Sequence, residues 1–106
     1  RGVRELIPVP EIMYCRADQK YVTVCHAGGE DLIEESLRQL EDEFGEHFLR
    51  IHRKTLVARD RLAGVEPVGS RWYVRLRGLD VRLEVSRRHA GHVRALLSER
   101  GERSGD

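Results

Sequence analysis

The sequence has few cysteines and no long apolar run. Cys15 and Cys25 form neither a C-x-x-C pair nor a dense framework, which argues against a disulfide scaffold or a structural zinc site and predicts buried thiols. No apolar run approaches the roughly 20 residues that span a bilayer, and the opening residues lack the apolar segment of a signal peptide. We therefore expect a cytoplasmic protein with no membrane association.

Signatures of catalysis are also missing. The sequence contains no G-x-S-x-G, no P-loop and no H-E-x-x-H motif. His89 and His92 have the spacing of one helical face, but no third metal ligand accompanies them. His52 lacks an identifiable partner for general-base chemistry. The sequence therefore predicts a protein that is not an enzyme and holds no metal or cofactor.

The length and the charge distribution favour one small domain with a basic side. A chain of 106 residues suits a single domain, which we expect to have a core within about 6–97 and a frayed tail at 101–106. Residues 1–45 contain 5 Lys or Arg against 10 Asp or Glu, whereas residues 46–106 contain 14 against 8. Such asymmetry allows one face to meet a polyanion.

Short apolar runs bounded by turn residues predict a mainly antiparallel β fold in small sheets. Trp72, Val74 and Leu76, for example, alternate with polar residues as on a half-buried strand. No alternation of strands with helices is present, which argues against a doubly wound fold. Outside the central basic segment, the predicted strands cover residues 6–9, 12–14, 21–26, 31–34, 62–68, 72–76 and 81–85.

Two helices are expected. Ser36 and Gln39 have the spacing of a capping box, and Gly45 marks a C-terminal stop, which predicts a helix near 36–44. Its apolar stripe comprises Ile33, Leu37, Leu40 and Phe44, and the opposite face, with Arg38, Glu41, Asp42 and Glu43, is expected to be solvated. Ser86 as N-cap predicts a second helix near 87–100.

The segment from Phe48 to Val57 concentrates positive charge between apolar residues. Its expected core positions are Leu49, Ile51, Leu56 and Val57. Its polar positions, with up to four positive charges, are Arg50, His52, Arg53 and Lys54. Crowded like charges favour an anionic ligand or a partner surface, although they also fit a solvated basic edge.

Arg87 and Arg88 place two further positive charges at an unfavourable position, the start of the second helix. The helix dipole disfavours cations in the first turn by about 0.3–1 kcal/mol each. A phosphate there would be favourable, because it would meet guanidinium groups and free N–H donors. Two tolerated surface arginines are the alternative.

Several of these segments resemble one known family, the LytTR domain, which is the DNA-binding output module of many bacterial response regulators. The resemblance covers about residues 6–97. It is carried by an early Ile-x-Tyr strand, Lys20-Tyr21-Val22, Ser36-Leu37-x-x-Leu40, Phe48-Leu49-Arg50-Ile51-His52-Arg53-Lys54, Leu56-Val57 and Val85-Ser86-Arg87-Arg88. It implies about ten short strands in small antiparallel sheets, with loops that enter successive major grooves and bend the DNA.

The resemblance also implies which residues contact DNA. Three separate contact regions correspond to Lys20 with Tyr21, Arg53 with Lys54, and Arg87 with Arg88. Arg50 and His52 belong to the motif as well, although His52 can equally be a core histidine that holds its strand. The chain departs from the family at Ala58, where Asn is usual, and at Lys54, where Ser is frequent.

By this resemblance, the chain is a sequence-specific double-stranded DNA-binding domain in a two-component phosphorelay that regulates transcription. The resemblance further implies that the chain acts as a homodimer on repeated half-sites, and that a sensor kinase acts through a receiver domain outside this chain. A protein-interaction module with a basic edge that docks an acidic partner is the alternative. An RNA-binding module fits less well, because the Tyr and Trp residues are scattered rather than paired as a stacking platform.

Overall fold

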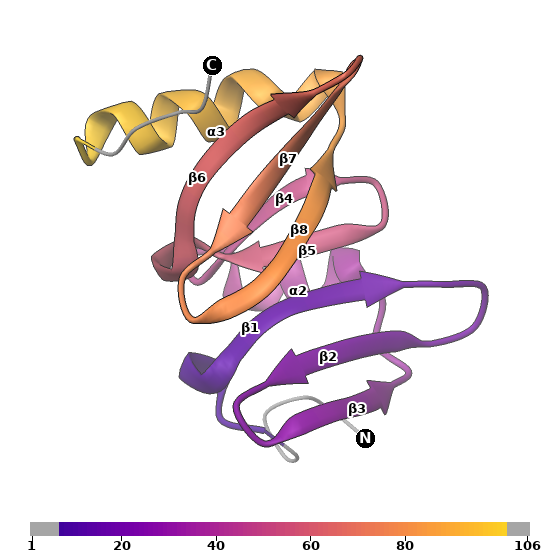
Figure 1. Ribbon diagram of the computed structural model, residues 1–106. Helices are drawn as coiled ribbons and strands as arrows, with labels where there is room; N and C mark the ends of the chain where they lie inside the picture. Colours follow the sequence, from indigo (N-terminus) through magenta and orange to yellow (C-terminus); the bar gives the residue numbers. More distant parts are fainter. Residues whose placement is uncertain (1–6, 102–106) are drawn as a thin grey trace. The chain divides into compact units, whose positions relative to one another are not determined.

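A computed structural model describes residues 7–101 (Figure 1). Within this range the chain forms two compact units. The first unit comprises residues 7–50 and 54–60, and the second comprises residues 51–53 and 61–101. The end of the central basic segment therefore belongs to the second unit, and Lys54 begins the return to the first.

The first unit is built on a five-stranded sheet with strand order β3-β2-β1-β5-β4. A short 3-10 helix, η1 (Val9–Glu11), leads into it. The strands are β1 (Ile12–Ala17), β2 (Val22–His26), β3 (Gly29–Ile33), β4 (Phe48–His52) and β5 (Thr55–Ala58), and α2 (Leu37–Phe44) lies between β3 and β4 in the sequence. Strand β1 pairs antiparallel with both β2 and β5.

The core of this unit lies between the sheet and α2. Leu37 and Leu40 project from the apolar stripe of the helix and are buried. They belong to one cluster with Ile7, Ile12, Cys15, Val22, Val24, Ile33, Phe48 and Leu56. An isolated helix of this length is marginal in water, so docking on the sheet stabilises α2.

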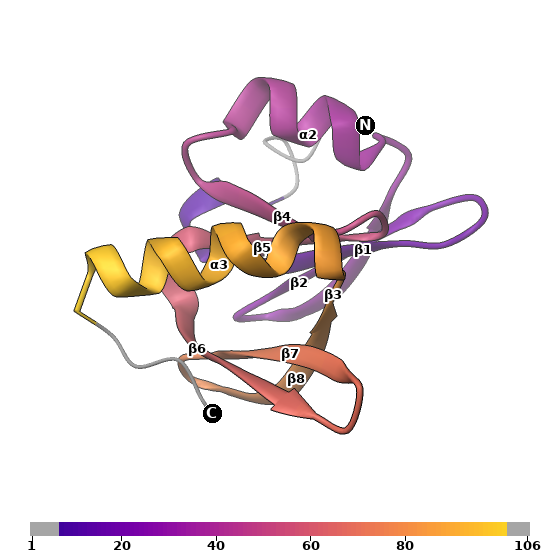
Figure 2. The same cartoon turned by 90° about the horizontal axis from the view of Figure 1, so that it is seen from above.

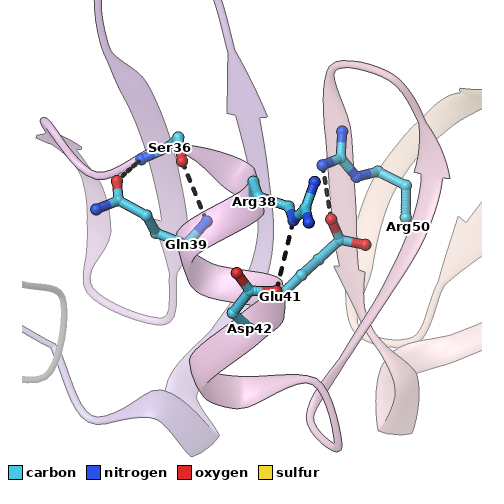
Figure 3. A network of polar contacts seen from close by, with 6 residues as sticks. All are labelled: Ser36, Arg38, Gln39, Glu41, Asp42 and Arg50. Atoms are coloured by element: carbon cyan, nitrogen blue, oxygen red, sulfur yellow. Dashed lines mark hydrogen bonds and ion pairs between the residues drawn. The ribbon is translucent and has the colours of Figure 1, made fainter.

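Local chemistry fixes both ends of α2, and Figure 3 shows the contacts at its start. The Gln39 N–H donates to Ser36 Oγ over 3.1 Å, and the Ser36 N–H donates to Gln39 Oε1 over 2.7 Å, which completes the predicted capping box. Gly45 is the C-cap, with a right-handed φ of −61°. A Cβ at Gly45 would lie 2.7 Å from the Glu41 carbonyl oxygen, so close backbone approach explains the glycine.

The second unit is a three-stranded sheet, in the order β6-β7-β8, with one helix (Figure 2). Its elements are β6 (Leu62–Val68), β7 (Arg71–Leu76), β8 (Leu79–Val85) and α3 (Arg87–Glu99). Helix α3 packs on β6 and β7. The buried residues of these elements include Leu62, Val65, Val74, Leu76, Leu83, Val85, Ala90, Val93 and Leu97. A second 3-10 helix, η2 (Arg59–Arg61), precedes β6.

The predicted class, mainly antiparallel β with two helices, is confirmed. The described residues contain eight strands in two sheets, fewer than the about ten that the family resemblance implied. The strand predicted over residues 6–9 is wrong where the structure describes it, because Val9 starts the 3-10 helix η1 between Pro8 and Pro10. Leu6 and the tail at 102–106 lie outside the described residues.

Both cysteines are buried free thiols, as the sequence predicted. Cys15 is fully buried, and burial raises the pKa of its thiol to about 12. Burial also raises the pKa of Cys25. Neutral, protonated thiols therefore line the strand pair β1–β2, where they behave as small apolar side chains.

Replacement of Ser36 by alanine tests the capping box. Ser36→Ala leaves the Gln39 N–H without its acceptor, and we expect the free energy of unfolding to fall by about 0.5–2 kcal/mol. Urea denaturation with an unchanged m-value measures this loss. Ser98→Ala, at an exposed position of α3, is the control and should change stability by less than about 0.5 kcal/mol. Equal effects of the two substitutions would contradict the assignment.

Candidate nucleic-acid interface

In the first unit, the β1–β2 loop presents Lys20 and Tyr21. Asp18 shapes this loop, because its Oδ1 accepts the N–H groups of Lys20 over 3.2 Å and of Tyr21 over 3.4 Å. The Asp18 N–H in turn donates to the Tyr21 carbonyl over 3.0 Å. Lys20 is exposed, and Tyr21 retains 37% of its surface. The loop therefore holds a cation and an aromatic ring at the surface by hydrogen bonds to the backbone.

Lys54 lies at the same end of this sheet. The Ala17 N–H at the end of β1 donates to the Lys54 carbonyl over 2.9 Å. In the antiparallel register of β1 with β5, Arg16 lies opposite Thr55, which is the residue that follows Lys54. The first unit thus brings together Lys20, Tyr21 and Lys54.

In the second unit, one backbone hydrogen bond joins the end of β4 to the start of α3. The Ser86 N–H donates to the Ile51 carbonyl over 2.9 Å. Arg53 follows two residues after Ile51, and Arg87 follows Ser86 directly. Both arginines are exposed, as is Arg88. The bond therefore places two cationic segments that are far apart in sequence beside each other.

The first turn of α3 is basic throughout. It contains Arg87 and Arg88 and no acidic residue. Ser86 is the N-cap residue, as predicted, but its side chain accepts no backbone N–H. Its hydroxyl instead forms a 2.6 Å hydrogen bond with His89 Nδ1. Within residues 7–101 no ion pair or hydrogen bond engages the side chain of Arg87 or Arg88.

Arg50 and His52 differ from these exposed cations. Arg50 lies on β4 and donates to Glu41 Oε1 of α2 over 2.7 Å, with 21% of its side chain exposed (Figure 3). The prediction that Glu41 is solvated is therefore wrong, since Glu41 pairs with Arg50. His52 is half-buried at the last position of β4. A DNA contact for either residue stays a prediction.

Arg87 also lines a small pocket of the second unit. The other lining residues are Ser70, Arg71, Trp72, Glu84, Val85 and Ser86. Arg71 Nη1 donates to both carboxylate oxygens of Glu84, over 3.1 and 3.0 Å. Arg71 was not among the candidate residues predicted from the sequence. No local signal identifies it, because only the β7–β8 pairing register brings it to Glu84.

The described residues offer no metal centre. No group of three or more His, Cys, Asp or Glu side chains within residues 7–101 could hold an ion. The rings of His89 and His92 lie 6.5 Å apart between centroids and are tilted by 44°. Over the same range, no helix has the length and apolar character needed to cross a membrane.

A sequence model of the LytTr DNA-binding domain family matches residues 3–98. The chain therefore belongs to this family of DNA-binding domains. Among solved structures it is similar to the LytTr DNA-binding domain of a Bacillus cereus protein described as a methyl-accepting/DNA response regulator. The TM-score is 0.74 at 25% identity, over 86% of this chain and 84% of that one.

Among curated proteins, the chain is similar to the positive alginate biosynthesis regulatory protein of Pseudomonas aeruginosa. It is 51% identical to this chain over 98 residues, which cover 90% of this chain and 39% of that protein. The chain thus spans about two fifths of the length of this curated relative. The segments 40–46 and 56–59 by themselves indicated a likeness to the alginate regulator of pseudomonads, and that likeness is confirmed.

The Arg50–Glu41 ion pair predicts a structural effect of Arg50. Both partners are less than one third exposed, so Arg50→Ala should lower the free energy of unfolding by about 1–2 kcal/mol, between the values for exposed and buried pairs. The control is Arg38→Ala, whose 3.6 Å pair with Asp42 is largely exposed and worth about 0.5 kcal/mol or less. Urea denaturation measures both, and a loss at Arg50 no larger than at Arg38 would contradict the structural role.

Proposed function

We propose that this chain is the sequence-specific double-stranded DNA-binding domain of a two-component transcriptional regulator. The observation that carries this proposal is the family match over residues 3–98. The exposed cations of the two units supply the chemistry. Double-stranded DNA carries one phosphate charge per about 1.7 Å of helix axis, so clustered lysine and arginine side chains bind it favourably. The same cluster of like charges does not stabilise the domain on its own.

In the second unit, Arg53 and Arg87 read bases. A guanidinium group can donate two parallel hydrogen bonds to guanine O6 and N7, which distinguishes guanine in the major groove. The Ser86–Ile51 hydrogen bond supports this role, because it limits the relative movement of the two segments. Arg88 and the first turn of α3 hold a phosphate, since the helix dipole there favours an anion.

In the first unit, Lys20 and Lys54 act as phosphate contacts, and Tyr21 adds a contact from the same loop. Lysine is a compact, flexible cation that suits phosphate contacts more than base recognition. Arg50 and His52 extend the motif along β4. Loops of this kind enter successive major grooves of a bent duplex, and the acidic β3 and α2 segments remain away from the DNA.

The family also suggests how the chain assembles on DNA and how its binding is controlled. The chain acts as a homodimer on repeated half-sites in the cytoplasm, because two linked domains gain affinity from one continuous operator. A sensor kinase controls DNA binding through a receiver domain outside this chain.

Selection of bound duplexes from a random DNA library tests this function. The result expected is a recovered motif, repeated at helical-turn spacing, whose affinity falls with salt and exceeds that of a scrambled duplex. Enrichment of no motif, with equal salt-sensitive binding to both duplexes, would overturn the proposal. Tight binding to an acidic protein or polymer in that case would favour a protein-interaction module.

Substitution of single arginines separates base reading from phosphate contact. Arg53→Ala and Arg87→Ala should each cost about 1–3 kcal/mol of binding to the selected duplex and relax the preference at one base pair. Arg88→Ala should weaken all duplexes alike and lower the slope of log affinity against log salt by about one. Fluorescence anisotropy with matched and mismatched duplexes measures this. Unchanged specificity in both Arg53→Ala and Arg87→Ala would contradict the assignment.

A further inference from the structure

The pocket beside Arg87 has the composition of a phosphate-binding site. It lies in the second unit, at the end of the sheet where the β6–β7 turn meets the β8–α3 junction. Ser70 and Arg71 line it from the turn and the start of β7, and Ser86 and Arg87 line it from the start of α3. The residues that line this cavity therefore include two arginines and two serines, together with Glu84.

The size of the pocket limits what it can hold. Its volume is about 250 Å³, below the roughly 300–1,000 Å³ of typical cofactor and drug sites but several times the roughly 30 Å³ share of one water. One tetrahedral anion with a few waters fits this space. Its donors are those that hold phosphate oxygens in proteins, with arginine as the bidentate partner.

We propose that this pocket seats one backbone phosphate of the DNA, next to the base that Arg87 reads, and that Arg71 is the additional phosphate ligand. This inference rests on the proposed function. It adds the β6–β7 turn to the DNA contacts and makes Arg71 a positioning residue, because a phosphate held beside Arg87 fixes the register of that side chain on the groove.

The present partner of Arg71 is easily replaced. Glu84 accepts both hydrogen bonds from a single nitrogen, Arg71 Nη1. The two side chains are 61% and 38% exposed, and an ion pair with that exposure contributes little to stability. Arg71 can therefore exchange the carboxylate for a phosphate at small cost, while Glu84 opposes the incoming anion. The carboxylate thus acts as a competitor for the site.

A second arginine on the same strand provides a matched control. Arg75 shares the face of β7 with Arg71 and donates to Glu66 over 3.1 Å. Its side chain is 49% exposed. Arg75 is not among the residues that line the pocket. Loss of either arginine removes one positive charge and one partly exposed ion pair. Only loss of Arg71 removes a ligand of the proposed site.

The opposite charges at Arg71 and Glu84 give opposite predictions for DNA binding. Arg71→Gln should weaken binding of the selected duplex about three- to tenfold and reduce the salt slope by about one. Glu84→Gln should strengthen binding about two- to fivefold, because the competing carboxylate is gone. Arg75→Gln should stay within about twofold of the wild type. A merely structural Arg71–Glu84 pair would make both of its variants weaker.

Trp72 supplies a second readout. It is the one tryptophan of the sequence and it lines the pocket. The duplex should change its fluorescence in the wild type, and less in Arg71→Gln. A titration with inorganic phosphate alone tests whether the pocket binds a free phosphate ion rather than a phosphate of the DNA backbone. Saturable phosphate binding with unaltered DNA binding by Arg71→Gln would assign the pocket to the free anion and overturn the DNA-backbone role.

Failure of the inference differs from failure of the proposed function. If the wild type binds no duplex selectively, the DNA-binding function itself is overturned and this inference with it. If the wild type binds selectively while Arg71→Gln matches Arg75→Gln in affinity and salt slope, only the pocket assignment is overturned. Far-ultraviolet circular dichroism establishes that each variant is folded, and the expected gain for Glu84→Gln is a result that misfolding cannot produce.

Discussion

The hydrogen bond from the Ser86 N–H to the Ile51 carbonyl is the contact on which the basic surface of the second unit depends. It joins a strand end and a helix start that are separated by 35 positions in the sequence. A hydrogen bond between buried or half-buried backbone groups cannot be given up cheaply, since each group would lose its partner. The segments that carry Arg53 and Arg87 therefore remain adjacent.

The positions of the charged side chains also distinguish exposed cations from paired ones. The first turn of α3 lacks the acidic residue that would complement its dipole, and Ser86 gives its hydroxyl to His89 rather than to a backbone N–H. By contrast, Arg50 has a short ion pair with Glu41. The fold thus neutralises a cation that lies on a strand and leaves the cations of the helix start exposed. Departures from local stability rules are common where a protein binds its ligand.

Much of the fold could be predicted from the sequence because its signals are local. The Ser36–Gln39 capping box and the alternation from Trp72 to Leu76 depend on residues a few positions apart, and both are confirmed. The strand at 6–9 was wrong because its apolar residues resemble a strand, whereas the prolines at 8 and 10 favour a turn of 3-10 helix. Local sequence patterns predict helices and strands more reliably than they predict the segments that connect them.

Contacts between distant residues were not predictable in this way. Glu41 and Arg50 meet only because α2 docks beside β4, and Arg71 meets Glu84 through the β7–β8 register. The spacing of these residues in the sequence predicts neither contact. Of the eight candidate DNA-binding residues, Lys20 and Tyr21 came from the family resemblance alone, whereas crowded positive charge also indicated the other six. The structure adds that six of the eight are exposed in loops or at the helix start. Arg50 and His52 are the half-buried exceptions.

The most direct test of this account is a titration of the isotopically labelled chain with its selected duplex, followed by backbone amide chemical shifts. We expect the largest changes at residues 20–21, 53–54 and 86–88, with both units responding at the same DNA concentration. The acidic edge strand Gly29–Ile33 should change little. Changes concentrated on that strand, or at only one of the two units, would contradict the claim that both basic surfaces bind one duplex.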